Sequence, residues 1–254
     1  MLHTPLELEI FSDPQLLARE AAAYWVAQAQ LSIAEHGAFY VALAGGSTPR
    51  RMYEYLARPE YATQVAWQDV HVFFGDERVV PPDHPDSNYR MAREALLDHV
   101  PLPVGQVYPM VQSGNGGEMA QAMALAYARG LDQILPKTEN GWPQFDLVML
   151  GMGVDGHTAS LFPHTTILHE AAQSCAAVYV EKLQAWRISL TFPVIEEASR
   201  ILILVCGEDK ANTLRQVFSS GGFDESMPIT RLVAQQNACW YLDAAAASLL
   251  GQGG

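Results

Sequence analysis

The residues best suited to chemistry lie in one segment, FDLVMLGMGVDGHTASLFP, which spans residues 145–163. His157 is the only side chain of this segment whose ordinary pKa lies near neutrality, so it is the candidate for a general base. Asp155 lies two residues before it and is close enough in sequence to orient the imidazole. A turn histidine can also do no more than hydrogen-bond a backbone carbonyl. The Asp-x-His pair alone does not separate the two interpretations.

The residues around this pair indicate where it lies in a fold. Residues 146–150 form an apolar run with the composition of a buried strand. Gly151 and Gly153 then allow a sharp turn and a close approach of the backbone to a ligand. A buried strand that ends in glycines and is followed by Asp, His and hydroxyl side chains is typical of a site at the carboxyl edge of an α/β sheet. This context favours a functional role for His157.

A second candidate site follows an apolar run at residues 39–44 and has the sequence GGSTP, with Gly45, Gly46, Ser47 and Thr48 before a proline. The glycines keep side chains away, the hydroxyls can cap a helix, and proline suits a first helical turn. A strand, such a turn and a helix N-terminus together favour an anion site. The P-loop and GxGxxG patterns are both absent. A plain capped helix after a tight turn is the alternative.

Two cations also follow predicted strands. Arg78 ends the sequence GDER, after the apolar run at 70–74, and can hold a phosphate with two hydrogen bonds. Lys210 follows the run at 201–206 and opens a predicted helix, where a positive charge opposes the helix dipole and therefore indicates an anionic partner. For Arg78 the alternative is a local ion pair with Asp76 or Glu77. For Lys210 it is a solvated surface lysine.

Composition limits the partners of the chain. The 254 residues carry 15 Lys and Arg against 28 Asp and Glu, a net charge of −13, which disfavours nucleic acid and anionic membranes as partners. No apolar run reaches the length of about 18 residues that a membrane span needs, and the N-terminal residues do not resemble a signal peptide. The three widely spaced cysteines fit reduced thiols. We therefore expect a cytoplasmic protein.

Alternating strands and helices predict the fold class. Beyond the runs already named, Leu8 and Ile10 alternate with glutamates, and we expect further strands at 176–180, 188–191 and 239–242. The expected helices span about 14–35, 88–99 and 118–135. This order predicts an α/β fold with a largely parallel, helix-covered sheet. We find no repeat or linker, and expect residues 1–254 to form a single domain.

Five segments together resemble the 6-phosphogluconolactonase family: GGSTP (45–49), GDERVVP with SNY (75–81 and 87–89), LGMGVDGHTASLFP (150–163), RISLT (187–191) and GEDKA (207–211). Their order and spacing match over nearly the whole chain. The resemblance implies a Rossmann-like sheet covered by helices on both faces, similar to the folds of glucosamine-6-phosphate deaminase and ribose-5-phosphate isomerase. It also implies hydrolysis of 6-phospho-D-glucono-1,5-lactone to 6-phosphogluconate, a step of the oxidative pentose phosphate pathway.

The resemblance also implies roles for individual residues. His157 would activate water as the general base, with Asp155 beside it. Arg78 and Lys210 would bind the phosphate together with the 45–48 turn, and Arg187 is a further candidate for this cluster. A lactone is an activated ester, so water needs only a base and some charge stabilisation. We expect no metal, since no Cys/His ligand set is visible, and no other cofactor.

Two other functions remain as alternatives. The deaminase motif has a tyrosine where Arg78 stands, and a catalytic glutamate where Phe162 stands, which counts against deaminase chemistry. A non-catalytic sugar-phosphate sensor would need the phosphate ligands but not His157. The sequence leaves open the oligomeric state, the tolerance for other phosphosugar lactones, the roles of Asp76 and Glu77, and substrate contacts from the C-terminal region.

Overall fold

A large parallel sheet forms the centre of the molecule. The computed structural model describes residues 7–112 and 117–251. Within them, six strands pair in the order β1-β9-β8-β5-β2-β3, and every neighbouring pair is parallel. Their bounds are β1 (Glu7–Phe11), β2 (Phe39–Leu43), β3 (Val70–Phe74), β5 (Leu147–Gly151), β8 (Arg200–Val205) and β9 (Ala238–Asp243). The strands predicted for this sheet are confirmed to within about one residue at most ends.

A second, antiparallel sheet lies beside the first and was not predicted. It has three strands in the order β4-β7-β6, with bounds β4 (Asp76–Arg78), β6 (Cys175–Val180) and β7 (Ala185–Leu190). We expected strands at 176–180 and 188–191, near the positions of β6 and β7, but did not predict that they form a separate sheet. The turn between them is too short for a parallel crossover, so they form a hairpin. β4 contains the three charged residues that follow β3, for which we had predicted no strand.

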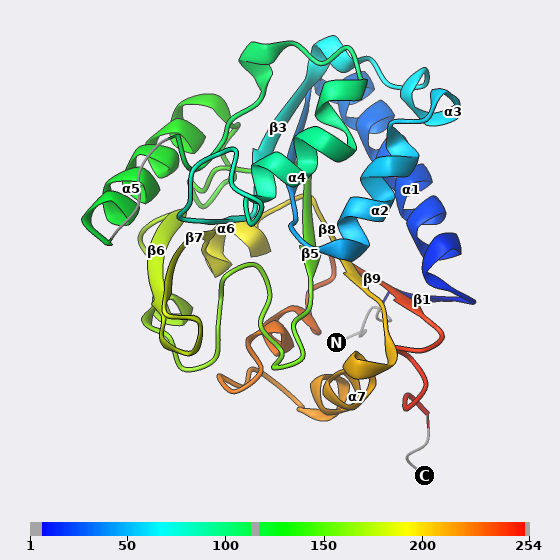
Figure 1. Cartoon of the computed structure of the whole chain (residues 1–254), viewed down its shortest axis with the longest axis vertical. Helices are drawn as coiled ribbons and strands as arrows, with labels where there is room; N and C mark the ends of the chain where they lie inside the picture. The colour runs from blue at the N-terminus through cyan, green and yellow to red at the C-terminus, as the bar shows by residue number, and fades with distance from the viewer. Residues whose placement is uncertain (1–6, 113–116, 252–254) are drawn as a thin grey trace.

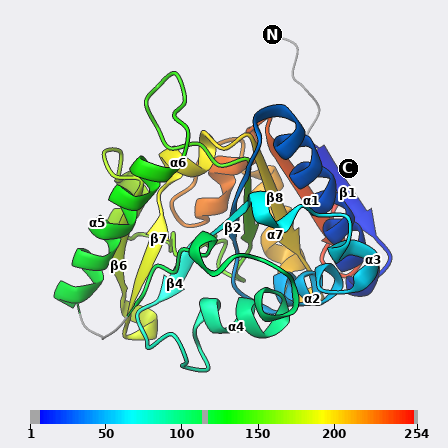
Figure 2. The ribbon, with the colours of Figure 1, turned by 90° about the horizontal axis from the view of Figure 1, so that it is seen from above.

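Helices flank the sheets (Figures 1 and 2). α1 and α2 lie beside the large sheet, and α5 packs against β6 and β7. The α-helices are α1 (Pro14–His36), α2 (Ser47–Leu56), α3 (Pro59–Ala62), α4 (Asn88–Ala95), α5 (Gly117–Ile134), α6 (Phe192–Glu196) and α7 (Ala211–Ser219). Among the described residues, no helix has the length and apolar character required to span a membrane. The prediction of an α/β fold with a mostly parallel, helix-flanked sheet is confirmed.

Local signals explain the bounds of the longest helix. The carboxylate of Asp13 accepts hydrogen bonds from the N–H groups of Gln15 and Leu16, each at 2.9 Å, and Pro14 occupies the first turn. At the other end Gly37 adopts φ 87°, and its N–H donates to the carbonyl of Ile33. This left-handed conformation suits glycine and ends the helix. The predicted range of about 14–35 is therefore confirmed.

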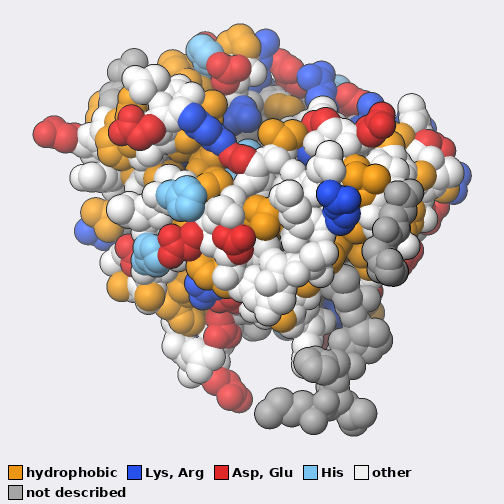
Figure 3. Space-filling model, turned by 90° about the horizontal axis from the view of Figure 1, so that it is seen from below, with side chains coloured by type: hydrophobic (Ala, Val, Ile, Leu, Met, Phe, Trp, Pro, Cys, Tyr) orange, Lys and Arg blue, Asp and Glu red, His pale blue; other side chains and the backbone are white. Residues whose placement is uncertain are grey.

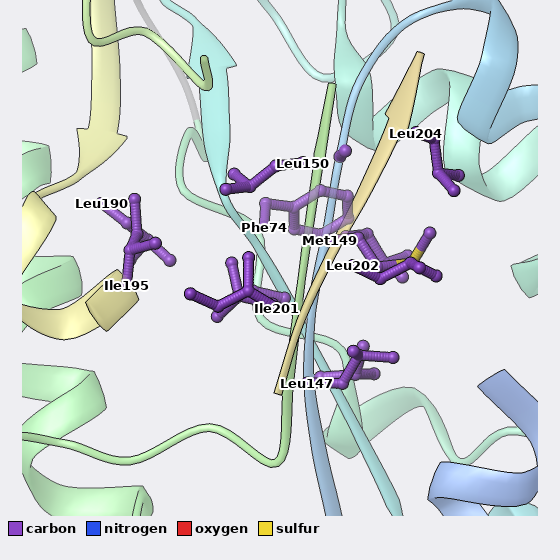
Figure 4. Packing of buried hydrophobic residues seen from close by; sticks show 14 of the residues in the cluster. Phe74, Leu147, Met149, Leu150, Leu190, Ile195, Ile201, Leu202 and Leu204 are labelled. Atoms are coloured by element: carbon purple, nitrogen blue, oxygen red, sulfur yellow. The ribbon is translucent and has the colours of Figure 1, made fainter. Parts of the chain in front are cut away.

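One hydrophobic cluster of buried residues unites the two sheets. Figure 4 shows Leu150 of β5 and Ile201 of β8 on the side of the large sheet that faces Leu190 of β7 and Ile195 of α6. β5 and β8 are apolar along almost their whole length, as expected for parallel strands that are covered on both faces. The two sheets therefore share one core.

The strand order determines where a ligand crevice can form. From β2 the chain continues to β3 on one side, whereas from β5 it continues to β8 and β9 on the other. β2 and β5 are neighbours, so the order reverses between them. In open α/β sheets, ligands bind at the carboxyl ends of the strands at such a point. The two segments singled out in the sequence, after residues 44 and 150, follow these two strands.

Glu77 connects β4 to the start of α4 and is 2% exposed. Its carboxylate accepts hydrogen bonds from the N–H groups of Arg78, Asn88 and Tyr89, each at 2.8 Å, and from the Ser87 hydroxyl at 3.0 Å. Ser87 is also the N-cap of α4. Glu77 therefore satisfies N–H groups that the first turn of a helix otherwise leaves unpaired.

We predict that Glu77→Ala lowers the free energy of unfolding by about 3 kcal/mol or more, because each buried donor left without an acceptor costs about 1–3 kcal/mol. Urea denaturation followed by circular dichroism measures the change. Glu94→Ala is the matched control, since Glu94 pairs with Arg90 on the surface of the same helix, and its loss should cost less than about 1 kcal/mol. Equal losses for the two variants would contradict this role of Glu77.

Candidate active site

A cavity of about 520 Å³ lies at the carboxyl ends of β2, β5 and β8. Segments that are far apart in the sequence contribute to its lining: the turns after these three strands, the second sheet with the turn between β6 and β7, and Asn88 at the start of α4. Every residue that we predicted for the site lines this cavity: Gly45, Gly46, Ser47, Thr48, Arg78, Asp155, His157, Arg187 and Lys210. The structure thus brings the predicted residues together, while their roles in binding and catalysis remain proposals.

His157 and Asp155 lie on a loop that hydrogen bonds hold in place. Nδ1 of His157 is 2.5 Å from Oδ1 of Asp155. The Gly153 N–H donates to the His157 carbonyl at 2.9 Å, and the Thr213 hydroxyl of α7 donates to the Val154 carbonyl at 2.6 Å. The imidazole is therefore paired with a carboxylate, and the alternative in which it only contacts a backbone carbonyl does not describe this structure.

The imidazole of His157 packs closely against two residues of its own loop. A Cβ atom added at Gly153 would lie 2.1 Å from Nδ1 and Cε1 of the ring, so only glycine leaves room for the histidine. The ring of Phe162 stacks on the imidazole with centroids 4.1 Å apart and an angle of 26° between the planes. Together, Gly153, Phe162 and the Asp155 carboxylate restrict the ring to one position.

The environment of His157 lowers its pKa to about 4. Burial is the largest cause, because it disfavours the charged imidazolium, and the positive charges of Lys210, Arg187 and Arg78 act in the same direction. The carboxylate of Asp76 opposes them, and that of Asp155, at hydrogen-bond distance, favours the imidazolium as well. The balance keeps the imidazole neutral at neutral pH, which is the form that can accept a proton.

The 45–48 turn differs in one respect from the prediction. We expected Ser47 or Thr48 to cap the helix, but α2 begins at Ser47 and its N-cap is Gly46, with φ 101°. No side chain makes a capping hydrogen bond at this end. The N–H groups of the first turn are therefore not occupied by a cap, and the positive end of the helix dipole lies at the cavity. This arrangement suits an anion better than the expected cap.

Gly45 lies against the side chain of Asn88, a residue of the SNY motif to which we had assigned no role. A Cβ atom at Gly45 would lie 2.1 Å from Oδ1 of Asn88. The amide of Asn88 donates to the carbonyl of Asp76 at 2.9 Å and to its carboxylate at 3.2 Å. The other carboxylate oxygen of Asp76 accepts from the Ser160 hydroxyl at 2.7 Å. Asp76 is thus a buried carboxylate that lines the cavity. It connects the loop after β5, through Ser160, to the start of α4, through Asn88.

Arg78 and Arg187 are direct partners in the antiparallel pairing of β4 with β7. Residues that are opposite each other in such a pair have side chains on the same face, and two like charges there are destabilising. Neither arginine forms an ion pair among the described residues. Arg78 instead donates to the Asp86 carbonyl at 2.6 Å. The predicted alternative of a local ion pair is wrong, and the two guanidinium groups favour an anion between them.

Burial lowers the pKa of Arg187, and the charge of Arg78 lowers it further. Lys210 is the third cation, at the N-cap of α7. Its side chain is only 20% exposed, with Nζ 3.1 Å from the exposed carboxylate of Asp209. This degree of burial argues against a solvated surface lysine.

The cavity has a charge balance unlike that of the whole chain. Four basic residues line it against three acidic ones, whereas the chain carries −13. On the face drawn in Figure 3, acidic, basic and hydrophobic side chains are interspersed.

The cavity residues that we missed are Asp76, Asn88, Ser160, Phe162 and Lys182. Asp76, Asn88, Ser160 and Phe162 lie inside the quoted motifs, but Lys182 has no sequence signal, because it lies in the turn between β6 and β7.

Groups of three or more His, Cys, Asp and Glu side chains that could hold a metal ion are absent from residues 7–112 and 117–251.

The Met227–Arg231 segment, for which we had no motif, packs against the loop that carries His157. The Ile229 N–H donates to the Gly156 carbonyl at 2.9 Å. A Cβ atom at Gly156, whose φ is +72°, would lie 2.8 Å from Met227. The segment therefore supports the His157 loop.

Comparison with known proteins gives a consistent result. The model of the family described as glucosamine-6-phosphate isomerases/6-phosphogluconolactonase matches residues 12–240. A 6-phosphogluconolactonase of Nostoc sp. is 36% identical over 243 residues, which cover 96% of this chain and 98% of the relative. The solved structure of 6-phosphogluconolactonase from Trypanosoma brucei superposes with a TM-score of 0.86 and 29% identity, over 97% of this chain and 99% of the other.

A monomeric glucosamine-6-phosphate deaminase also superposes, with a TM-score of 0.80 over 96% of this chain and all of the other. At 19% identity this likeness concerns the fold alone, and it confirms the predicted similarity to the deaminase fold. The family model covers most of the chain, and the Nostoc relative matches it almost end to end. The chain therefore belongs to the glucosamine-6-phosphate isomerase/6-phosphogluconolactonase family.

Proposed function

We propose that this protein is a 6-phosphogluconolactonase, which hydrolyses 6-phospho-D-glucono-1,5-lactone to 6-phospho-D-gluconate in the oxidative pentose phosphate pathway. The observation that carries the proposal is a single cavity that holds a neutral histidine paired with an aspartate and, beside it, a cluster of three cations. The relatives named 6-phosphogluconolactonase, which match nearly the whole chain, support the same activity.

The cations bind the phosphate of the substrate. Arg78 and Arg187 present two guanidinium groups from neighbouring strands, which suits the bidentate recognition of phosphate oxygens. Lys210 contributes a third positive charge, and the uncapped N-terminus of α2 contributes N–H groups from the 45–48 turn. The phosphate thereby relieves the repulsion between the two arginines.

His157 activates the attacking water. Because Nδ1 is engaged with Asp155, Nε2 is the nitrogen that remains to accept a proton. Water loses its proton to Nε2 and attacks the lactone carbon C1. The carbonyl oxygen becomes an oxyanion, which the N–H groups of a glycine turn can stabilise. Asp155 stabilises the imidazolium that forms and keeps the ring in its orientation.

The ring then opens. The bond between C1 and the ring oxygen breaks, and the imidazolium returns its proton to the departing oxygen, which becomes a hydroxyl group. The product is the carboxylic acid, which ionises and releases one proton to solvent. The sequence is balanced by one water molecule, and the histidine returns to its neutral state. Neither a serine nucleophile nor a cofactor enters this scheme.

The two alternatives are less well supported. Deaminase chemistry needs an acidic residue where Phe162 stands, and Phe162 here stacks on the imidazole and offers no titratable group. A sugar-phosphate sensor does not require an imidazole held at 2.5 Å from a carboxylate in the binding cavity. We further propose that residues 1–254 act as one domain in the cytoplasm, with the three cysteines as free thiols, and without nucleic acid or membrane partners.

The first prediction from the proposed function concerns activity. The purified protein should accelerate acid release from freshly made 6-phosphogluconolactone above the spontaneous rate, and should leave glucosamine 6-phosphate unchanged. A pH-stat measures the first reaction and an ammonia assay the second. Release of ammonia from glucosamine 6-phosphate would overturn the assignment in favour of the deaminase. Phosphate binding without any acceleration would favour the sensor.

The second prediction concerns the general base. His157→Asn should lower kcat by about 10²–10⁴-fold, the usual contribution of general base catalysis, while binding of 6-phosphogluconate and the melting temperature change little. Initial rates, corrected for uncatalysed opening, and product titration measure these quantities. A stable variant with wild-type turnover would exclude the catalytic role. A variant that loses rate, stability and product binding together would show that His157 only holds the loop.

The pH profile tests the same residue. Protonation of His157 should lower kcat/KM at acid pH and give the pH profile an acid limb. Since the pKa of His157 is lowered to about 4 in the free protein, the midpoint of this limb should lie well below the ordinary histidine pKa of about 6.5. The bound phosphate offsets the nearby positive charges, so the limb in kcat should lie at higher pH than the limb in kcat/KM. The limb due to His157 is the one that His157→Asn removes.

The third prediction concerns the phosphate. Arg78→Ala and Lys210→Ala should each weaken substrate binding, because each removes a charge-assisted contact worth about 1.5–3 kcal/mol. This predicts a KM that increases by about one to two orders of magnitude. Unphosphorylated gluconolactone is the matched control, and its kcat/KM should change much less. Equal losses on both substrates would mean that these residues support the fold or the chemistry instead.

A further inference from the structure

Lys182 lies in the turn between β6 and β7 and reaches the loop that carries His157. Its Nζ forms an ion pair with Oδ2 of Asp155, while Oδ1 of the same carboxylate is 2.5 Å from Nδ1 of His157. The three side chains are therefore connected in the order Lys182, Asp155, His157, and Asp155 uses a different oxygen for each neighbour. The lysine belongs to the second sheet, and the aspartate and histidine follow the large sheet.

The ring of Phe162 contacts both His157 and Lys182. It stacks on the imidazole of His157 at 4.1 Å, and Nζ of Lys182 lies 4.8 Å from the centroid of the same ring. A cation over an aromatic face is attracted by the ring electrons. Phe162 thus holds Lys182 in a position from which it contacts Asp155. Phe162, one of the two residues that distinguish this protein from the deaminase motif, thereby acquires a structural role.

Asp155 needs such an anchor for a physical reason. Its side chain is 25% exposed, and the cavity beside it contains three other cations, Arg78, Arg187 and Lys210, any of which attracts a carboxylate. A carboxylate drawn toward one of them would leave Nδ1 of His157 without a partner. The ion pair with Lys182 occupies the oxygen that is not used by the histidine and opposes this rotation.

We propose that Lys182 is a positioning residue for the hydrolysis: it fixes the Asp155 carboxylate, and through it the imidazole of His157, in the orientation required for proton transfer. The inference rests on the proposed function. It concerns no contact with the phosphate, although Lys182 lines the same cavity. Because Arg187 lies five residues further along the same hairpin, one element of the second sheet then carries a phosphate ligand and the anchor of the general base.

The test is a double-mutant cycle with Lys182→Met and Asp155→Asn. An exposed ion pair is worth up to about 1 kcal/mol, so we expect Lys182→Met to lower kcat about two- to fivefold with an unchanged KM. The decrease should be the same on unphosphorylated gluconolactone. In the Asp155→Asn background, the same substitution should leave kcat unchanged, because the carboxylate that the lysine positions is gone. Lys182→Arg keeps the cation and should restore kcat to within about twofold of the wild type.

Lys137→Met is the matched control, since Lys137 forms a surface ion pair with Asp132 away from the cavity. It should change neither kcat nor KM. Additive effects of Lys182→Met and Asp155→Asn would overturn the proposal. So would a KM that rises only for the phosphorylated substrate, which would make Lys182 a phosphate ligand. The wild-type rate decides the proposed function separately: if the wild type hydrolyses the lactone and the cycle is additive, only the inference about Lys182 fails.

Discussion

The pairing of the three-residue strand β4 with β7 is the constraint on which the site depends. It sets Arg78 directly opposite Arg187, an arrangement that is unfavourable until an anion lies between the two guanidinium groups. Side chains alternate along a strand, so Asp76 and Arg78 line the cavity while Glu77 points away from it. Glu77 is buried there against N–H groups at the start of α4, which fixes the strand.

The same cations have a second effect, on the histidine. With burial, they lower the pKa of His157 and keep it unprotonated in the free protein. Asp155 acts in the opposite direction, and its second oxygen is occupied by Lys182. Phosphate recognition and base strength are therefore linked, because they depend on the charges of one cavity. With the cations further from the imidazole, burial would still lower the pKa of His157, but by less than burial and the cations lower it together.

The elements that sequence reasoning located are those with local causes. The apolar runs of β2, β3, β5 and β8, and the caps of α1 at Asp13 and Gly37, depend on residues within a few positions of each other. The second sheet was missed because pairing partners are not local. Residues 76–78 are strongly charged and do not have the composition of a strand, and only the distant β7 makes them one. The predicted N-cap of α2 was wrong because both glycine and serine are compatible with the N-cap position, which Gly46 occupies.

The sequence by itself determined which residue types follow which strands, and this was enough to name His157, Asp155, Arg78, Lys210 and the 45–48 turn. Parallel strands end at a common edge, so residues after β2, β5 and β8 converge whatever the details of packing. Only the tertiary structure decided that Arg78 opposes Arg187, that Phe162 stacks on the imidazole, and that Lys182 pairs with Asp155. The contacts Arg78–Arg187 and Lys182–Asp155 join segments that strand register brings together, and the stacking of Phe162 on His157 depends on how their shared loop is packed. Neither register nor packing is encoded in a local pattern.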